Sequence, residues 1–181
     1  MSEIKTKIKK YKKFEIPKSP FVEYLENLEQ RGARGELAAL RRGLQYAPGE
    51  CIEMYHYVVP WLENVKSKWE KDIHYLIASL YAYHPRSSHS GNLGDTLRII
   101  YRSRGESNSI EQRFVALLRS NPEDLFFHLR QSISILKSEN IPVNWHELFY
   151  DLKRWPYESK FTPQEKWANS FWKQPKKEEI E

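Results

Sequence analysis

Apolar residues recur along this chain at intervals of three and four, which is the period of an amphipathic α-helix and not the alternation of a β-strand. The apolar faces of the two clearest helices are Ile73, Leu76, Ile77, Leu80 and Tyr81, and Leu125, Leu129, Ile133 and Leu136. Only 7 glycines interrupt the chain, and no segment alternates convincingly between apolar and polar residues. The pattern therefore predicts an all-α fold of about eight or nine helices.

Helix start and stop signals predict where several of these helices begin and end. Capping residues precede a proline or an acidic first turn at Ser19-Pro20, Asn121-Pro122, Asn144-Trp145 and Thr162-Pro163. Asn108, followed by Glu111, has the spacing of a capping box, and Gly32 is placed to end the first helix. Further helices are expected over about 35–45, 69–83 and 93–104.

The stretch 84–92, HPRSSHSGN, is the densest in turn-forming residues and separates two groups of helices. We therefore expect two helical bundles, over 19–88 and 89–173, that pack together in one compact chain. A basic N-terminal tail (1–18) precedes them, and a C-terminal tail (174–181) that frays follows. No sequence repeat of 20 to 50 residues supports a solenoid.

The net charge of +5 belongs to the N-terminal tail, because residues 1–18 hold seven lysines against Glu3 and Glu15. The rest of the chain is neutral overall, and all twelve arginines lie between Arg31 and Arg154. A planar guanidinium suits bidentate contacts to phosphate, although arginine is also common on solvated helix faces. Composition alone leaves both interpretations open.

The sequence also bears on the compartment. The N-terminal lysines are not followed by the apolar run of a signal peptide, and no stretch reaches membrane-spanning length. The single cysteine, Cys51, cannot form an internal disulfide and is interpreted as a small core residue. We expect a cytoplasmic protein.

Catalytic and cofactor-binding motifs are not found. None of the six histidines joins a carboxylate or cysteine at a recognised metal-ligand spacing, and no nucleophile motif is present. The stretch 91–94, GNLG, lacks the Gly-Lys-Ser/Thr that would make it a phosphate loop, so it is interpreted as a helix start. We expect no catalytic residue, metal or cofactor. Most aromatic residues fall at core spacing, and stacking on bases is a lesser possibility.

The stretch 31–43, RGARGELAALRRG, is the clearest candidate for a binding surface. In a helix, its leucines share one side while Arg34, Arg41 and Arg42 lie on the adjoining arc. In later helices, Arg113 and Arg119 flank core residues, and the seven-residue spacing of Arg130 and Lys137 places both on one face. The predicted nucleic-acid-binding residues are Arg34, Arg41, Arg42, Arg113, Arg119, Arg130 and Lys137. A surface facing an acidic protein partner is the alternative.

Six motifs then occur in a characteristic order: RGxRGxLAALRRG, AxxYAYHP, NLG, SIEQRFVALLRS, LFFHLRQSISILKSENIPVNWHELFYDLKRW and WANSFW. Over about residues 21–172 this order resembles the small-subunit (CasB) family of type I-E CRISPR Cascade complexes. The resemblance implies two helical bundles, no catalytic activity, and two copies in each complex. It also implies contact with the Cascade backbone and large subunits, the crRNA and the target and non-target DNA strands.

The resemblance assigns basic residues one by one. Arg41 and Arg42 match in LRRG, Arg119 matches in ALLRS, and Arg130 matches in HLRQ. Arg113 departs from the family pattern, since a basic pair is common where this chain has Gln112-Arg113. Asn144 stands where the family often has aspartate, a change that should preserve helix capping. The lysine-rich tail lies outside the resemblance, and a nonspecific clamp and a segment without function both stay open.

Overall fold

The computed structural model describes residues 18–174, and this part of the chain is almost entirely helical. The helices are α1 (Pro20–Gln30), α2 (Arg34–Arg42), α3 (Tyr55–Val58), α4 (Lys68–Tyr83), α5 (Leu93–Ser103), α6 (Asn108–Arg119), α7 (Pro122–Ser138), α8 (Trp145–Arg154) and α9 (Pro163–Phe171). Within 18–174 the only β-pairing is an isolated bridge between Ser87 and Val143. The predicted all-α class is confirmed. The residues of the two predicted tails lie outside this range, apart from Lys18 and Gln174.

The capping signals correctly predicted four helix starts. The side chains of Ser19, Asn121, Asn144 and Thr162 each accept a hydrogen bond from the backbone N–H three residues later. Each bond satisfies one of the N–H groups that a helix leaves free at its first turn. The stretch 91–94 also starts a helix, because Asn92 and Asp95 form a reciprocal capping box at the start of α5.

Two predicted helix boundaries are wrong, the C-terminal end of α2 and the start of α6. The helix expected over 35–45 ends at Arg42 and continues as a 3-10 turn, Gly43–Gln45, because glycine is a poor helix former and helix ends often tighten in this way. The predicted cap at Asn108 is also wrong. Gly105 and Glu106 both have positive φ and turn the chain one residue earlier, so Ser107 takes the N-cap position without a side-chain capping bond.

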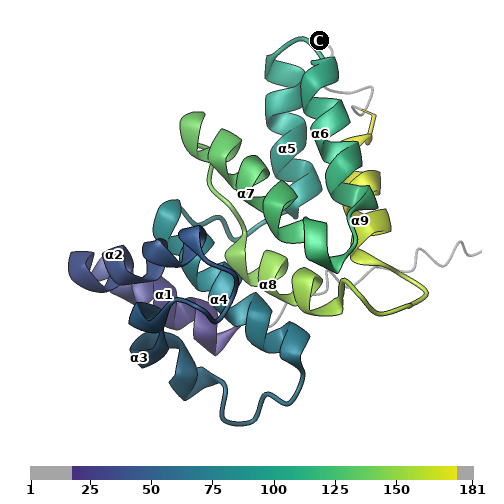
Figure 1. The fold of residues 1–181 in the computed structure, drawn as a ribbon. Coiled ribbons are helices and arrows are strands. Elements are labelled where there is room, and N and C mark those ends of the chain that lie inside the picture. The colour runs from purple at the N-terminus through teal and green to yellow at the C-terminus, as the bar shows by residue number, and fades with distance from the viewer. Residues whose placement is uncertain (1–17, 175–181) are drawn as a thin grey trace, which may run out of the picture.

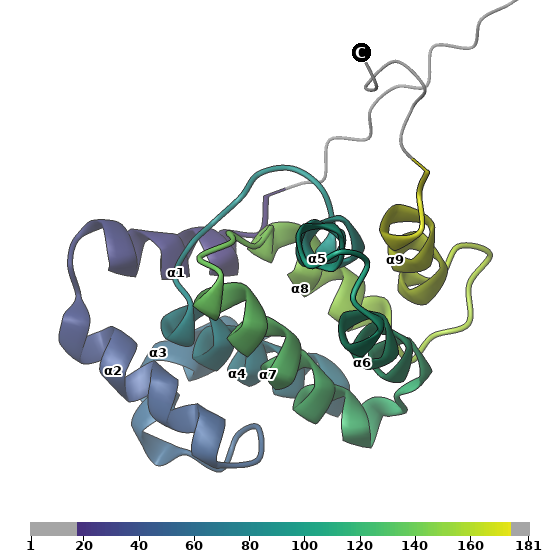
Figure 2. The same ribbon diagram turned by 90° about the horizontal axis from the view of Figure 1, so that it is seen from above.

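Helices α1 to α4 gather on one side of the molecule, and α5, α6 and α9 gather on the other (Figure 1). Between them lie α7, which packs on α4, α5 and α6, and α8, which packs on α1, α4 and α9 (Figure 2). The buried apolar residues of both sides form one continuous core. The face predicted for the helix over 69–83 is buried along α4, and Cys51 is part of the core as expected. The division into bundles at 88/89 stays a prediction.

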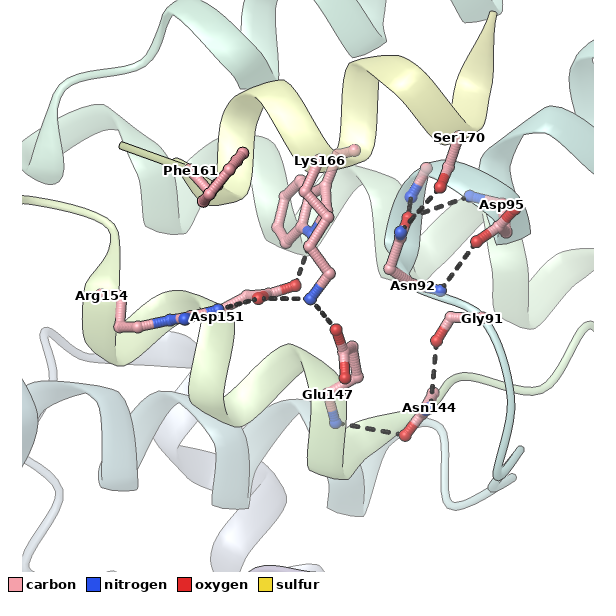
Figure 3. Close-up of polar contacts among 12 residues, drawn as sticks. Gly91, Asn92, Asp95, Asn144, Glu147, Asp151, Arg154, Phe161, Lys166 and Ser170 are labelled. Atoms are coloured by element: carbon pink, nitrogen blue, oxygen red, sulfur yellow. Dashed lines mark hydrogen bonds and ion pairs between the residues drawn. The ribbon is translucent and has the colours of Figure 1, made fainter. Parts of the chain in front are cut away.

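A buried ionic cluster attaches α9 to α8 (Figure 3). The Lys166 ammonium on α9 contacts a carboxylate oxygen of Glu147 and lies 2.9 Å from Oδ1 of Asp151. The Trp167 indole N–H donates to the other Asp151 oxygen at 2.7 Å, and Arg154 lies 3.2 Å from Oδ1. The carboxylate side chains are 3% and 1% exposed, so this cluster is part of the interior.

A second set of polar contacts joins the loop over 84–92 to the same two helices (Figure 3). The Asn92 side chain donates to Oγ of Ser170 at 2.8 Å, and the Asn144 side chain donates to the carbonyl oxygen of Gly91 at 3.0 Å. The two capping residues therefore also hold the loop in place, and the loop in turn sets where α5 begins.

Burial raises the pKa of Asp151 to about 6, even though Trp167 and Arg154 donate hydrogen bonds to it. Because the folded pKa lies above the ordinary value of 3.8, the folded state binds this proton more tightly than the unfolded state does. The contribution of Asp151 to stability is therefore fully present below pH 3.8 and is lost as the pH rises through about 6.

Asp151→Asn should remove this pH dependence. Between pH 7 and pH 4, the free energy of unfolding of the wild type should rise relative to that of the variant by up to about 3 kcal/mol, at 1.36 kcal/mol per pKa unit. Urea unfolding of the wild type and the variant at both pH values measures this change in the free energy of unfolding. A stability difference between the two proteins that is the same at pH 7 and pH 4 would contradict the prediction.

Candidate nucleic-acid interface

A groove of about 530 Å³ lies where α2, the C-terminal end of α4 and the C-terminal end of α7 meet. The residues that line it are Glu29, Arg34, Leu37, Arg41, Ala82, Tyr83, His84, Pro85, Arg86, Lys137 and Asn140. They come from both predicted bundles and from the loop between them. Sequence segments that are about one hundred residues apart thus form one concave surface.

The opening of the groove is cationic. Arg34, Arg41, Arg86 and Lys137 are all exposed, and Glu29 is the one carboxylate among the lining residues. Three of the lining residues are buried, namely the apolar Leu37 and Ala82 together with His84. Charges of one sign around a concave, low-dielectric surface concentrate the electrostatic field there. The groove therefore favours an anionic ligand that has an apolar part.

Two side-chain contacts organise this opening. Arg86 donates a hydrogen bond to Oδ1 of Asn140, which joins the loop after α4 to the turn after α7. The Lys137 ammonium lies 3.7 Å from the centre of the Tyr83 ring, a cation–π distance. Both cations are therefore positioned before any ligand enters.

The structure brings three of the predicted site residues, Arg34, Arg41 and Lys137, together in this groove. Arg86 is a fourth cation that lines the groove, and the sequence analysis did not predict it. It lies in a loop, so no helical spacing marked it. The one available signal was its place directly after AxxYAYHP.

The other predicted site residues lie elsewhere. Arg42 is exposed and lies 3.4 Å from Glu53, with which it forms a surface ion pair. Arg130 is half-buried on α7, where it donates to the carbonyl oxygen of Tyr46 at 3.1 Å, and burial lowers its pKa. Arg113 and Arg119 are exposed on α6, and Arg119 borders a separate depression beside Gln112 and Val115. The structure therefore does not gather all seven residues at one site.

Glu26, His89 and His146 are the one group of possible metal ligands found within residues 18–174, with ligand atoms within 4.8 Å of one another. Nδ1 of His146, however, accepts the backbone N–H of Ser19 at 2.9 Å. The proton of a neutral imidazole must then be on Nε2, which faces Glu26 at 3.4 Å, and a protonated nitrogen cannot bind a metal. The geometry is that of a hydrogen-bonded cluster that holds the start of α1 against α8.

Comparison with known proteins identifies the family. The family model for the CRISPR-associated protein Cse2 matches residues 36–172. The chain is also 31% identical over 179 residues to the CRISPR-associated protein Cse2 of Thermus thermophilus, which covers 91% of this chain and 98% of that protein. The chain belongs to the Cse2 family.

Solved structures agree with this assignment. The crystal structure of M. ruber CasB matches with a TM-score of 0.70 and 35% identity, over 83% of this chain and 89% of that one. A chain of a CRISPR RNA-guided surveillance complex matches with a TM-score of 0.68 and 25% identity, over 83% and 92% of the two chains. The resemblance that the six motifs indicated is confirmed. Within residues 18–174 of this Cse2-family chain, no helix is both long and apolar enough to cross a membrane.

Proposed function

We propose that this Cse2-family chain is a non-catalytic subunit of a CRISPR RNA-guided surveillance complex, Cascade, and that its groove binds nucleic-acid backbone. The observation that carries the proposal is the convergence of Arg34, Arg41, Arg86 and Lys137 in one groove. Family membership and the match to a chain of a surveillance complex support the same role.

In this role, the subunit stabilises the R-loop by contacts that do not depend on sequence. Guide and target pair by base complementarity, and exchange of one duplex for another is nearly balanced in free energy. Backbone contacts from a protein can therefore tip the balance toward the open state, and cations that meet phosphates provide such contacts. The ligands are the crRNA, the target strand or the displaced non-target strand.

The exposed cations outside the groove fit the same assembly. Arg42 lies on α2 near the groove, whereas Arg113 and Arg119 lie on α6. We assign these faces to additional strand contacts or to the Cascade backbone and large subunits, with a second copy of the chain in the complex. The subunit works in the cytoplasm, where its guide and target strands meet.

The experiment replaces three groove arginines together, as Arg34→Gln, Arg41→Gln and Arg86→Gln. Binding of a fluorescent single-stranded DNA to the full chain is followed by anisotropy between about 50 and 200 mM salt. Each lost phosphate contact should reduce the slope of log affinity against log salt by about 0.7, so three contacts should reduce it by about 2. Affinity should fall similarly for strands of different sequence.

The matched control is the triple variant Lys66→Gln, Lys68→Gln and Lys71→Gln. It changes net charge equally, but these exposed lysines lie at the opposite end of α4 from the groove. Its slope should remain close to that of the wild type. Unchanged affinity and slope in a folded Arg34, Arg41 and Arg86 variant would disprove the proposal and would indicate that these arginines face protein.

A further inference from the structure

We infer that the groove accepts a single strand with one nucleobase stacked on the ring of Tyr83. The inference rests on the proposed function and names the part of the ligand that the cationic residues do not explain. Tyr83 is the last residue of α4, it is half-buried, and its side chain lines the groove beside Leu37 and Pro85.

The Tyr83 ring is held in place before a ligand arrives. Its hydroxyl lies 3.4 Å from Oγ of Ser134 on α7, which fixes one edge of the ring. The Lys137 ammonium lies 3.7 Å from the ring centre, so a long, exposed lysine side chain covers one face of the ring. A ring that is already ordered loses little side-chain entropy when a second planar group stacks on it.

The charges around the ring explain how the face becomes available. Lys137 is exposed, and Arg34, Arg41 and Arg86 line the same groove. A phosphate that enters among these arginines attracts the ammonium of Lys137 more strongly than the ring does, since a charge-assisted contact to phosphate exceeds a cation–π contact at an exposed site. The released face is then open to the base attached to that phosphate.

The chemistry of the groove matches a nucleotide better than a bare phosphate. Besides its cations, the groove is lined by the Tyr83 ring and by the buried apolar residues Leu37 and Ala82. A base within a duplex is already stacked on its neighbours and cannot present its face. The ligand is therefore a single-stranded segment, in which stacking on an aromatic ring is largely independent of base identity.

The experiment compares the full chain bound to two single strands of equal length, one of mixed sequence and one in which every base is replaced by an abasic site. Both strands carry the same phosphates, so the ratio of their affinities measures the contribution of the bases to binding. The wild type should prefer the base-bearing strand by about 5- to 150-fold, the range that corresponds to the stacking of one base. Tyr83→Leu should reduce this preference strongly and leave the salt slope unchanged.

Two further variants make the result specific. Tyr83→Phe keeps the aromatic face and should keep the preference, and Tyr157→Leu removes an exposed tyrosine outside the groove and should also keep it. Thermal unfolding checks that each variant is folded.

The failures of the two proposals are distinguishable. If Tyr83→Leu retains the full preference while the Arg34, Arg41 and Arg86 variant still lowers the salt slope, the groove binds backbone alone and the stacking inference is wrong. If the wild type binds neither strand, the proposed function and the stacking inference fail together. Loss of the preference in Tyr83→Phe as well would assign the effect to the hydroxyl and overturn stacking.

Discussion

Replacing Lys166 with Met should lower the free energy of unfolding by about 3 to 5 kcal/mol, the cost of leaving a buried charge without its partner. The Lys166 ammonium contacts Glu147 and lies 2.9 Å from Asp151, and both carboxylates are almost fully buried. Methionine retains most of the apolar stem, so the variant removes the charge with little change in packing. Arg154 is 60% exposed at 3.2 Å from Asp151 and cannot replace the lost cation at Glu147.

The pH dependence of this loss has a definite sign. Without Lys166 the pKa of the Asp151 carboxyl rises further, and the folded state can take up a proton to avoid the unpaired charge. The difference in stability between wild type and variant should therefore be largest above about pH 6, the pKa to which burial already raises Asp151. It should shrink as the pH falls below that value. Adding Glu147→Gln to Lys166→Met should recover part of the loss, because Glu147 is the carboxylate left without a cation, whereas Asp151 keeps its ion pair with Arg154.

A matched control lies on α8, the helix that carries both carboxylates of the cluster. Lys153 of α8 pairs with Glu70 of α4 at 3.1 Å, with side chains 28% and 30% exposed. Because solvent screens this pair, Lys153→Met should cost about 1 kcal/mol or less. Chemical unfolding of both variants at pH 7 and pH 5 makes the comparison. Equal losses for Lys166→Met and Lys153→Met would show that burial does not set the energy of the cluster.

Sequence periodicity predicted the helices well because burial of an apolar face and capping are local properties. The leucine and isoleucine faces of α4 and α7 are buried as expected, and caps such as Asn121 and Asn144 are formed. The ionic cluster could not be predicted in this way. In the sequence, Asp151 stands beside Lys153 and Arg154, a pattern typical of the polar face of an amphipathic helix. Its burial depends on α9, which is placed there by tertiary packing.

The residues of the groove could likewise be predicted only in part from the sequence. The arc of α2 correctly placed Arg34 and Arg41 on an exposed face, but Arg86 joins them only because a loop folds against α7. Arg130 and Lys137 share a helix face, as their spacing predicted, yet their surroundings differ. Arg130 lies under the chain near Tyr46, whereas Lys137 is exposed over Tyr83. Periodicity predicts which face of its helix a side chain is on, and the packing of neighbouring elements determines which residues that side chain contacts.

Gly94→Ala should destabilise the protein by about 3 kcal/mol or more, at the upper end of the cost of overpacking. Gly94 lies in the first turn of α5, where its backbone packs directly on that of α9. An added Cβ would overlap the carbonyl oxygen of Trp167 and lie 2.9 Å from its Cα. Backbone atoms cannot rotate away as a side chain can, so α9 would have to move as a whole.

That movement would disturb contacts on the far side of α9. Trp167 is fully buried and donates its indole N–H to Asp151 at 2.7 Å, and Lys166 beside it holds the ionic cluster. A shift of α9 away from α5 therefore weakens its attachment to α8 as well. Hydrogen exchange should show faster exchange in α9 of the variant, and urea unfolding should give the total loss.

Gly35→Ala provides the control with the opposite sign. Gly35 lies in α2, and a Cβ there would meet nothing within 4 Å. Because alanine favours a helix interior over glycine by about 1 kcal/mol, this variant should be up to that much more stable than the wild type. Helix propensity alone predicts that both substitutions stabilise. A gain at both positions would mean that α5 and α9 can separate without cost, whereas opposite signs would identify the close approach at Gly94 as the reason that only glycine fits there.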